Sequence, residues 1–276
     1  MVLQWNPEQT AVLKLFRRML RRADSPRRIR VEGPAASGKS ALLQVHSTRC
    51  CGRSGAGVAD GRLLVQEMES LSLARWPNGV MVLAPTNTAA DAVGGRTLHR
   101  ALGIPNTAPY APLDQAALSE LGLGAVRVVL LDNYHQVNPH VLYTADRRFR
   151  QAAGSDGEPF GGRIVVVFSD DRSIPPYRNP ALDNGLDYVL DTFSSPVLTL
   201  STTYFADPTF GAAVGRLRAG AVSAADRQMY DTRKLEVLEP EDQPAFLEGA
   251  KVCYNKDDCA HFNHVYRRVH TRLTWT

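Results

Sequence analysis

A glycine-rich segment that ends in lysine and serine is the part of this sequence best suited to chemistry. Residues 33–40 read Gly-Pro-Ala-Ala-Ser-Gly-Lys-Ser, which fits the phosphate-loop pattern Gly-x-x-x-x-Gly-Lys-Ser/Thr. In such a loop the backbone N–H groups point inward and surround a phosphate. Lys39 would neutralise the β and γ phosphates of ATP or ADP, and the Ser40 hydroxyl would ligate Mg²⁺. The predicted nucleotide contacts of the loop are Gly33, Ala35, Ala36, Ser37, Gly38, Lys39 and Ser40.

An aspartate at the end of an apolar segment completes the predicted metal site. Residues 128–131 read Val-Val-Leu-Leu, and Asp132 follows them directly. Because α/β sheets bind ligands at the carboxyl ends of their strands, Asp132 would emerge beside the phosphate loop. We therefore predict that Asp132 shares the Mg²⁺ ion with Ser40, and that Lys39 and Asp132 are the catalytic residues.

The elements that must position these residues predict an α/β fold with a doubly wound parallel sheet. Apolar side chains recur at helical spacing over residues 7–23, with Asn6 as a cap and Pro7 at the first helical position. A strand over residues 28–31 would lead into the phosphate loop. Four more short runs rich in Val, Leu and Ile are typical of buried parallel strands covered by helices on both faces. They are residues 80–84, 126–131, 164–168 and 197–200.

The composition excludes several classes of protein. The chain has 276 residues, of which 44% are hydrophobic and 22% charged, enough apolar material for one large domain or two modest ones. No apolar run reaches the roughly 18 residues of a membrane span. The start of the chain has no apolar signal-peptide core, so we expect an intracellular protein, nuclear or cytoplasmic and not secreted.

The charged residues and cysteines leave two questions open. The net charge of +4 permits nucleic-acid binding without requiring it. Seven arginines crowd residues 17–30, and such a cluster is either a solvated helix face or a phosphate-binding patch. The four cysteines imply no disulfide framework in an intracellular chain. Cys253, Cys259, His261 and His264 lie near one another in the sequence, but their spacing matches no standard zinc site.

Six stretches of the chain match the motifs of one family in order. They are residues 6–9, 84–90 with 95–99, 159–162, 169–176, 202–205 with 210 and 217–220, and 252–255 with 263. Together they resemble the motor domain of a Pif/RecD-type superfamily 1 DNA helicase. The most diagnostic stretch is Ala-Pro-Thr-Asn-Thr-Ala-Ala, followed by Gly-Arg-Thr-Leu-His. The resemblance implies a RecA-like P-loop domain over residues 1–195 and the start of a second, incomplete RecA-like domain over residues 196–276.

The resemblance also implies roles for residues outside the phosphate loop. Gln9 would read adenine, although it also suits a capping box with Asn6. Single-stranded DNA would cross the top of the motor and contact Pro85, Thr86, Asn87, Thr97 and His99. Hydroxyl and backbone contacts to phosphate hold a strand without reading its sequence, and a histidine ring can stack on a base. Thr86 and Thr97 are also good helix caps.

The chain departs from the family pattern where the γ phosphate and the attacking water would lie. Asn133 stands where the family has the glutamate that acts as general base, and an amide takes up no proton at neutral pH. Ser169 and Ser173 replace the glycine and glutamine of motif III, and Phe205 replaces the arginine of motif IV. The arginine finger of the second domain would follow Thr276. His135 is an alternative base.

Three functions are consistent with these residues. The first is an ATP-dependent DNA helicase of the 5′-to-3′ type, with impaired hydrolysis and, by resemblance, a role in DNA repair or recombination. The second is a non-enzymatic module that binds nucleotide and DNA and serves as an interaction partner. The third, a P-loop kinase for a small molecule, leaves the match at residues 84–99 unexplained.

Overall fold

The chain forms two compact units in a computed structural model, Met1–Phe205 and Ala206–Thr276. The structure describes residues 5–43, 79–105, 107–170, 172–176, 178, 180–232, 234, 237, 239–241, 257, 259–261 and 264. The predicted motifs at 252–255 and 263, and Cys253, lie outside the described residues. The predicted domain boundary lies between residues 195 and 196. The strand at Val197–Thr199 follows that boundary but belongs to the first unit, which ends at Phe205.

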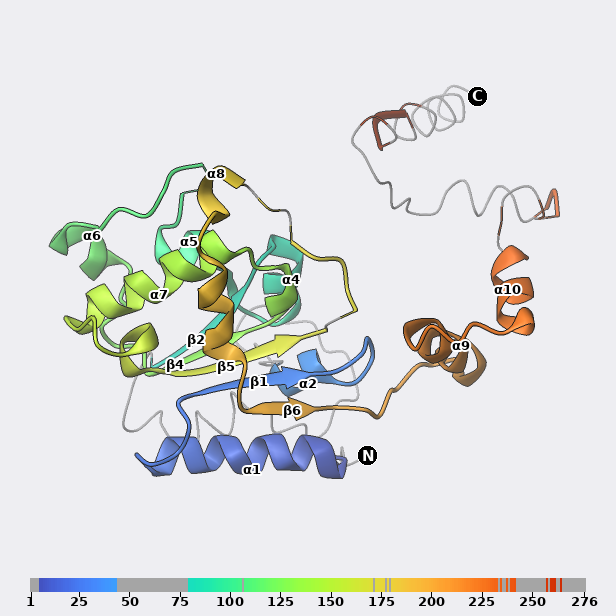
Figure 1. Cartoon of the computed structure of the whole chain (residues 1–276), viewed down its shortest axis with the longest axis horizontal. Coiled ribbons are helices and arrows are strands. Elements are labelled where there is room, and N and C mark those ends of the chain that lie inside the picture. Colours follow the sequence, from blue (N-terminus) through green and yellow to red (C-terminus); the bar gives the residue numbers. More distant parts are fainter. Residues whose placement is uncertain are drawn as a thin grey trace, which may run out of the picture. The chain divides into compact units, whose positions relative to one another are not determined.

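The first unit contains a six-stranded parallel sheet, which confirms the predicted fold class (Figure 1). The strands are β1 (Arg28–Glu32), β2 (Val80–Ala84), β3 (Arg96–Thr97), β4 (Val128–Leu131), β5 (Ile164–Ser169) and β6 (Val197–Thr199). Their spatial order is β3-β2-β4-β5-β1-β6. All of the predicted apolar runs form strands. The edge strand β3 was not predicted, because it has two residues and no apolar side chain.

Helices cover both faces of the sheet. In the first unit they are α1 (Pro7–Arg21), α2 (Lys39–Leu43), α4 (Asn87–Ala92), α5 (Leu98–Leu102), α6 (Gln115–Glu120), α7 (Pro139–Ala153) and α8 (Pro180–Asp183). The 3₁₀ helices are η1 (Tyr134–Gln136), η2 (Pro159–Gly162) and η3 (Asp187–Phe193). In Figure 1, α1 runs along one side of the sheet, and α5 and α7 lie on the other.

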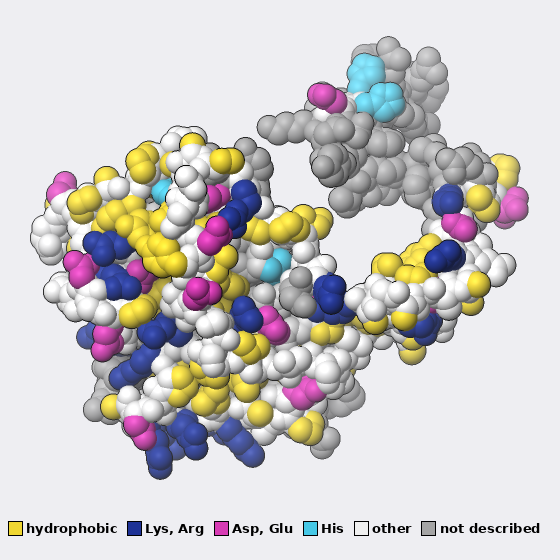
Figure 2. All heavy atoms as spheres, viewed as in Figure 1, with side chains coloured by type: hydrophobic (Ala, Val, Ile, Leu, Met, Phe, Trp, Pro, Cys, Tyr) yellow, Lys and Arg dark blue, Asp and Glu magenta, His cyan; other side chains and the backbone are white. Residues whose placement is uncertain are grey.

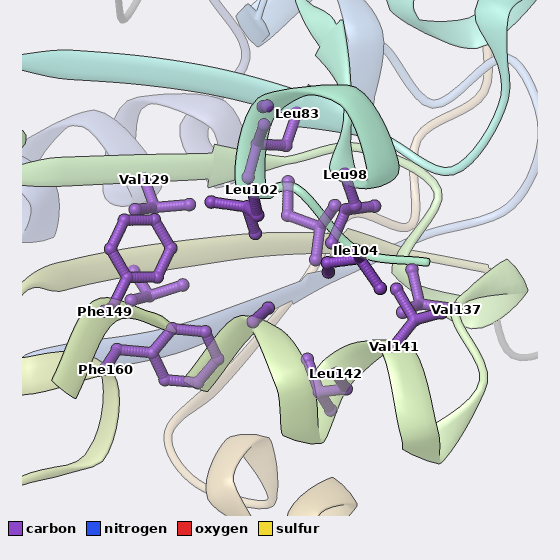
Figure 3. Packing of buried hydrophobic residues seen from close by; sticks show 14 of the residues in the cluster. Leu83, Leu98, Leu102, Ile104, Val129, Val137, Val141, Leu142, Phe149 and Phe160 are labelled. Atoms are coloured by element: carbon purple, nitrogen blue, oxygen red, sulfur yellow. The ribbon is translucent and has the colours of Figure 1, made fainter. Parts of the chain in front are cut away.

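Alternate side chains of the central strands enter two separate cores. Val128 and Leu130 of β4 pack into the core beneath α1 and α2, with Phe16 and Leu42. The neighbouring side chains of the same strand belong to the core beneath α5 and α7. Figure 3 shows Val129 in this second core with Leu102, Leu142, Phe149 and Phe160. Both faces of β4 and β5 are buried, and the two strands are apolar up to Ser169, the last residue of β5, so their carboxyl ends are held in fixed positions.

The second unit contains α9 (Pro208–Arg218) and α10 (Ala224–Asp231). Arg216 joins them through a two-pronged ion pair with Asp226, with Nε–Oδ2 and Nη2–Oδ1 distances of 2.8 and 2.6 Å. Bonds from Arg216 and Ser223 hold the pKa of Asp226 well below its usual range. Among the described residues, no helix is long and apolar enough to cross a membrane.

Candidate nucleotide-binding site

The parallel sheet gathers the predicted site residues along one edge. Gly33 follows β1, Asp132 follows β4 and Asp170 follows β5. Because β5 pairs with both β1 and β4, these three strand ends are neighbours. The phosphate loop therefore lies opposite the predicted metal ligand, as the sequence indicated.

The phosphate loop is tightly fixed by its own lysine. The buried Nζ of Lys39 donates hydrogen bonds to the carbonyl oxygens of Gly33 and Pro34, at 2.6 and 2.7 Å. Gly38 has a left-handed φ of 84°, which glycine adopts without strain. Gly33 is required for close approach, since a Cβ there would lie 2.8 Å from the carbonyl oxygen of Leu200. The lysine thus holds its positive charge inside the curve of the loop.

Ser40 and Asp132 meet as predicted for a shared metal ion. The Ser40 hydroxyl donates to Oδ2 of Asp132 at 3.1 Å, and the Asn133 N–H donates to Oδ1 at 2.9 Å. Asp132 is 3% exposed. Burial raises the pKa of Asp132, while the bonds from Asn133 and Ser40 and the charge of Lys39 oppose the rise. A hydroxyl and a carboxylate are hard oxygen ligands of the kind that Mg²⁺ prefers, so this pair fits the ion.

A cavity of about 350 Å³ lies against the loop. Its lining contains most of the predicted nucleotide contacts, together with polar residues from η1 and from the segment after β5. The lining residues are Ala35, Ala36, Ser37, Gly38, Lys39, Ser40, Ala41, Asn133, His135, Gln136, Asp170 and Ser173. Gln136 was missed in the sequence, where only its position soon after Asp132 could have indicated it. The volume is within the roughly 300–1,000 Å³ of sites that bury small ligands.

The histidine in this cavity is oriented by the backbone. The Asp170 N–H donates to Nδ1 of His135 at 3.1 Å. Burial lowers the pKa of His135, although the charges of Asp170 and Asp132 oppose the shift. With Nδ1 accepting, the neutral ring carries its proton on Nε2 and offers the cavity a donor. This arrangement argues against His135 as a replacement general base.

The amino end of α1 reaches the phosphate loop through Gln9. The predicted capping box is present: Asn6 Oδ1 accepts from the Gln9 N–H at 2.7 Å, and the Asn6 N–H donates to Gln9 Oε1 at 3.1 Å. The other end of the same amide lies against the loop, where a Cβ on Gly38 would come within 2.5 Å of Gln9 Nε2. Gln9 is 5% exposed. Capping is therefore confirmed, while adenine recognition by Gln9 stays a prediction.

The segment that follows β6 is bonded to both α1 and the loop. The Tyr204 N–H donates to the Ala36 carbonyl at 2.8 Å, and the Asn6 amide donates to the Tyr204 hydroxyl at 3.0 Å. The Ser201 N–H and hydroxyl both donate to the carboxylate of Glu8. Hydrogen bonds from Ser201 lower the pKa of Glu8. This cluster was not predicted, because its partners are distant in the chain.

The residues predicted to meet DNA lie farther along the same edge, at the ends of β2 and β3. Thr86 and Thr97 cap α4 and α5 by accepting from the N–H groups of Ala89 and Arg100, at 3.2 and 3.3 Å. Their capping role is thus confirmed, and DNA contact by either residue stays a prediction.

The other predicted DNA contacts keep some exposure. Asn87 is exposed, and Pro85 and His99 are half-buried. Burial, followed by the charge of His140, lowers the pKa of His99 and favours its neutral ring. A neutral ring suits the predicted stacking on a base, which stays untested. In the described part of the chain, no group of His, Cys, Asp and Glu is arranged to hold a metal ion.

The sheet, the loop between β1 and α2, and the acidic end of β4 define the fold of a RecA-like P-loop protein. Solved structures of Pif1 helicases share this fold. One, from a study of DNA unwinding at forked double-stranded DNA by two coordinating Pif1 helicases, is 22% identical with a TM-score of 0.63, and the match covers 95% of this chain and 57% of that one. Unliganded Pif1 from a Bacteroides species is 22% identical with a TM-score of 0.60, and the match covers 95% of this chain and 56% of that one.

A third similar structure is the Pif1 helicase of Candida albicans. It is 21% identical with a TM-score of 0.59, and the match covers 82% of this chain and 47% of that chain. This chain therefore spans less than two thirds of the length of these helicases. No protein-family model and no curated protein sequence matches it.

Proposed function

We propose that this chain binds ATP or ADP with Mg²⁺ and belongs to the motor of a DNA helicase of the 5′-to-3′ type, acting in DNA repair or recombination. The observation that carries the proposal is the meeting of Ser40 and Asp132 beside a loop whose lysine is already held inside it. When bound, Mg²⁺ would neutralise phosphate charge between these two oxygen ligands. The loop amides and Lys39 would hold the β phosphate.

Single-stranded DNA is the proposed second ligand of this chain. Pif1 structures with a similar fold have been solved bound to single-stranded DNA, and with ADP-AlF₃ and single-stranded DNA together. In this chain, the exposed Asn87 and the half-buried Pro85 and His99 lie at the same sheet edge as the phosphate loop. A strand laid along that edge would meet α4 and α5, whose first turns present polar groups to phosphate.

Hydrolysis is proposed to be weak because the altered residues all belong to the γ-phosphate side. Asn133 lines the cavity but offers no base, and the neutral His135 presents a donor. Ser173 also lines the cavity, but its side chain is too short to make the contact of a glutamine. Loss of a general base removes roughly 10²–10⁴ in rate. The groups on the β-phosphate and metal side, Lys39, Ser40 and Asp132, are in place.

The same observations favour a second candidate, a module that binds nucleotide and DNA without turning ATP over. In that case the chain acts as an interaction partner, and the fixed His135 ring and Asn133 are its normal state. The two candidates agree on the binding site and differ only in turnover. The domain assignment of residues 196–276 as part of a second motor domain is proposed on the resemblance alone.

Equilibrium binding of ATP with Mg²⁺, measured beside ATPase activity with and without single-stranded DNA, tests the proposal. Lys39→Ala removes a charge-assisted bond to phosphate, worth about 1.5–3 kcal/mol, and so should weaken ATP binding by about 10- to 150-fold. Lys14→Ala, at an exposed position of α1, is the matched control and should bind as the parent does.

The turnover results separate the candidates. DNA-stimulated hydrolysis supports a working motor, and binding without hydrolysis supports the non-enzymatic module. Turnover that requires a small acceptor in place of DNA would favour the kinase instead. If the parent binds no ATP, or if Lys39→Ala binds it as well as the parent does, the proposed site is wrong.

A further inference from the structure

Three arginines stand at the opposite edge of the sheet from the nucleotide site. Arg27, Arg127 and Arg163 each directly precede a strand, namely β1, β4 and β5. These three strands are adjacent, with β5 in the middle. The backbone joins the three positions: the Ile164 N–H donates to the Arg127 carbonyl at 3.0 Å, and the Val165 N–H to the Arg27 carbonyl at 2.8 Å. All three arginines line one cavity of about 140 Å³.

Arg163 is the most buried of the three, and the hydrogen-bond partners that the described residues offer it are backbone carbonyls. It is 5% exposed, and its Nη1 and Nη2 groups donate to the carbonyls of Phe149 and Leu123, at 2.9 and 3.0 Å. In the described part of the chain, its Nε has no hydrogen-bond partner. Burial, and then the charge of Arg127, lower the pKa of Arg163 to about 10. Nη1 also contacts the carbonyls of Phe160 and Gly161, and the guanidinium lies over the Phe149 ring, 5.1 Å from its centroid. The buried charge therefore faces carbonyl dipoles and a ring, and among the described residues it has no carboxylate partner, an arrangement that a bound anion would improve.

Little negative charge faces this cavity. Among the described residues, no carboxylate forms an ion pair with Arg27, Arg127 or Arg163. One acidic group does lie beside the cavity, since Oε2 of Glu158 would be 2.7 Å from a Cβ on Gly162, which also lines the cavity.

The surface beside the cavity is also basic. Leu20 brings α1 to the cavity wall, and the end of this helix exposes Arg18, Arg21 and Arg22. Figure 2 shows Lys and Arg side chains gathered on this side of the first unit, from the start of the strands down to α1. The local field therefore favours an anion.

We propose that this cavity is a second anion site, which binds a single phosphate group between Arg27 and Arg127 with the charge of Arg163 behind it. Guanidinium groups bind phosphate through paired, charge-assisted hydrogen bonds, and a bound anion would compensate the charge of Arg163. The volume suits one oxyanion and is below the roughly 300–1,000 Å³ of sites that bury whole ligands. The phosphate would come either from free inorganic phosphate or from a nucleic-acid backbone. The site is separate from the phosphate loop and does not depend on the function proposed above.

The test uses the full chain with Lys39→Ala, which weakens phosphate binding at the nucleotide site. Inorganic phosphate is titrated at constant ionic strength, and binding is followed by calorimetry and by the rise in Tm. Arg127→Gln and Arg27→Gln should each weaken phosphate binding by about tenfold or more. The control is Lys14→Gln, at an exposed position of α1 outside both the cavity and the arginines at the end of the helix, and it should bind as its parent does.

Arg163 is left unchanged because its Nη1 contacts the carbonyls of Phe160 and Gly161 in η2, and replacing it could unfold that turn. Circular dichroism should show that the variants fold, since Arg127 is exposed and Arg27 only half-buried. Arg127→Lys, which keeps the charge, should bind more tightly than Arg127→Gln. The proposal fails if the Lys39→Ala chain shows no saturable phosphate binding, or if the Arg27 and Arg127 variants bind as the control does.

A labelled single-stranded oligonucleotide distinguishes the two sources of phosphate. If the site holds a nucleic-acid backbone, Arg127→Gln should weaken oligonucleotide binding, and free phosphate should compete with the oligonucleotide in the parent. If the site holds free phosphate, oligonucleotide binding should be the same in Arg127→Gln and Lys14→Gln, while the difference in phosphate binding remains.

Discussion

Replacing Asn133 with glutamate tests whether this one residue accounts for the weak hydrolysis that we propose. Asn133 has φ and ψ of 50° and 41°, a left-handed conformation that asparagine tolerates better than most residues do. Its N–H donates to Asp132, whose pKa burial already raises. A glutamate here would restore a carboxylate beside the cavity. It would also place a longer residue in the left-handed region and a second negative charge next to a buried one.

The structure sets the expected size of the effect on stability. The left-handed region costs an ordinary residue roughly 1–2 kcal/mol, and the added charge acts in the same direction. We expect Asn133→Glu to lower the free energy of unfolding by about 1–2 kcal/mol, which corresponds to a fall in Tm of roughly 2–8 °C. We expect no strand separation, because Ser173 and Phe205 still occupy the positions of the family's glutamine and arginine. Groups that act together in catalysis are not restored one at a time.

The assay compares thermal unfolding, ATP hydrolysis and unwinding of a forked DNA substrate in three variants. Asn133→Gln has the cost of a longer residue in the left-handed region but no added charge. Asn133→Gly removes that backbone cost, so the free energy of unfolding of the Gly variant should lie within about 0.5 kcal/mol of the parent's. Vigorous unwinding by Asn133→Glu would refute the view that the other substitutions also disable the motor. A Gln variant as stable as the parent would refute the backbone argument.

Three further predictions concern single side chains. Asp132→Asn should raise Tm at neutral pH and weaken Mg²⁺-dependent ATP binding. Because the pKa of Asp132 is raised, the folded state binds its proton more readily than the unfolded state does, so the gain in Tm should shrink as the pH falls through that raised pKa. Gln9→Ala should lower the free energy of unfolding by about 0.5–2 kcal/mol, since the Asn6 N–H loses its acceptor. Calorimetry should also show that this variant prefers ATP over GTP less than the parent does. Thr97→Ala should lower the free energy of unfolding by about 1 kcal/mol, because the Arg100 N–H loses its capping acceptor, whereas Thr97→Ser should keep the stability. If both variants bind single-stranded DNA more weakly than the parent, the methyl group of Thr97 is a DNA contact.

The sequence predicted those parts of the fold whose signal is local. The runs that became β2, β4, β5 and β6 are short and mostly apolar, and composition suffices to find them even though only β4 and β5 are buried throughout. The strand β3 is different, because it exists only through the pairing of Leu83 and Ala84 with Arg96 and Thr97. A two-residue polar edge strand has no pattern of its own, so only its neighbour reveals it.

The candidate site divides in the same way. The phosphate loop and Asp132 were predictable, because a motif between a strand and a helix fixes the backbone and a strand end fixes the carboxylate. The bond from the Asp170 N–H to His135, and those from Ser201 to Glu8, join residues far apart in the sequence. Such contacts follow from how the strand ends are ordered in the sheet, and one sequence does not specify that order.

The proposal that binding persists while hydrolysis fails requires the two halves of the site to be built separately. The half proposed to hold the β phosphate is built from the loop and the strand end of β4, and its bonds join Lys39 to Gly33 and Ser40 to Asp132. The half proposed to face the γ phosphate is built from η1 and the segment after β5, where the ring of His135 is held by the backbone. In the described structure, no bond of the Lys39 ammonium to the loop carbonyls depends on the side chains of the second half. A substitution at Ser173 can therefore remove a contact to the γ phosphate and leave the groups that bind the β phosphate in position.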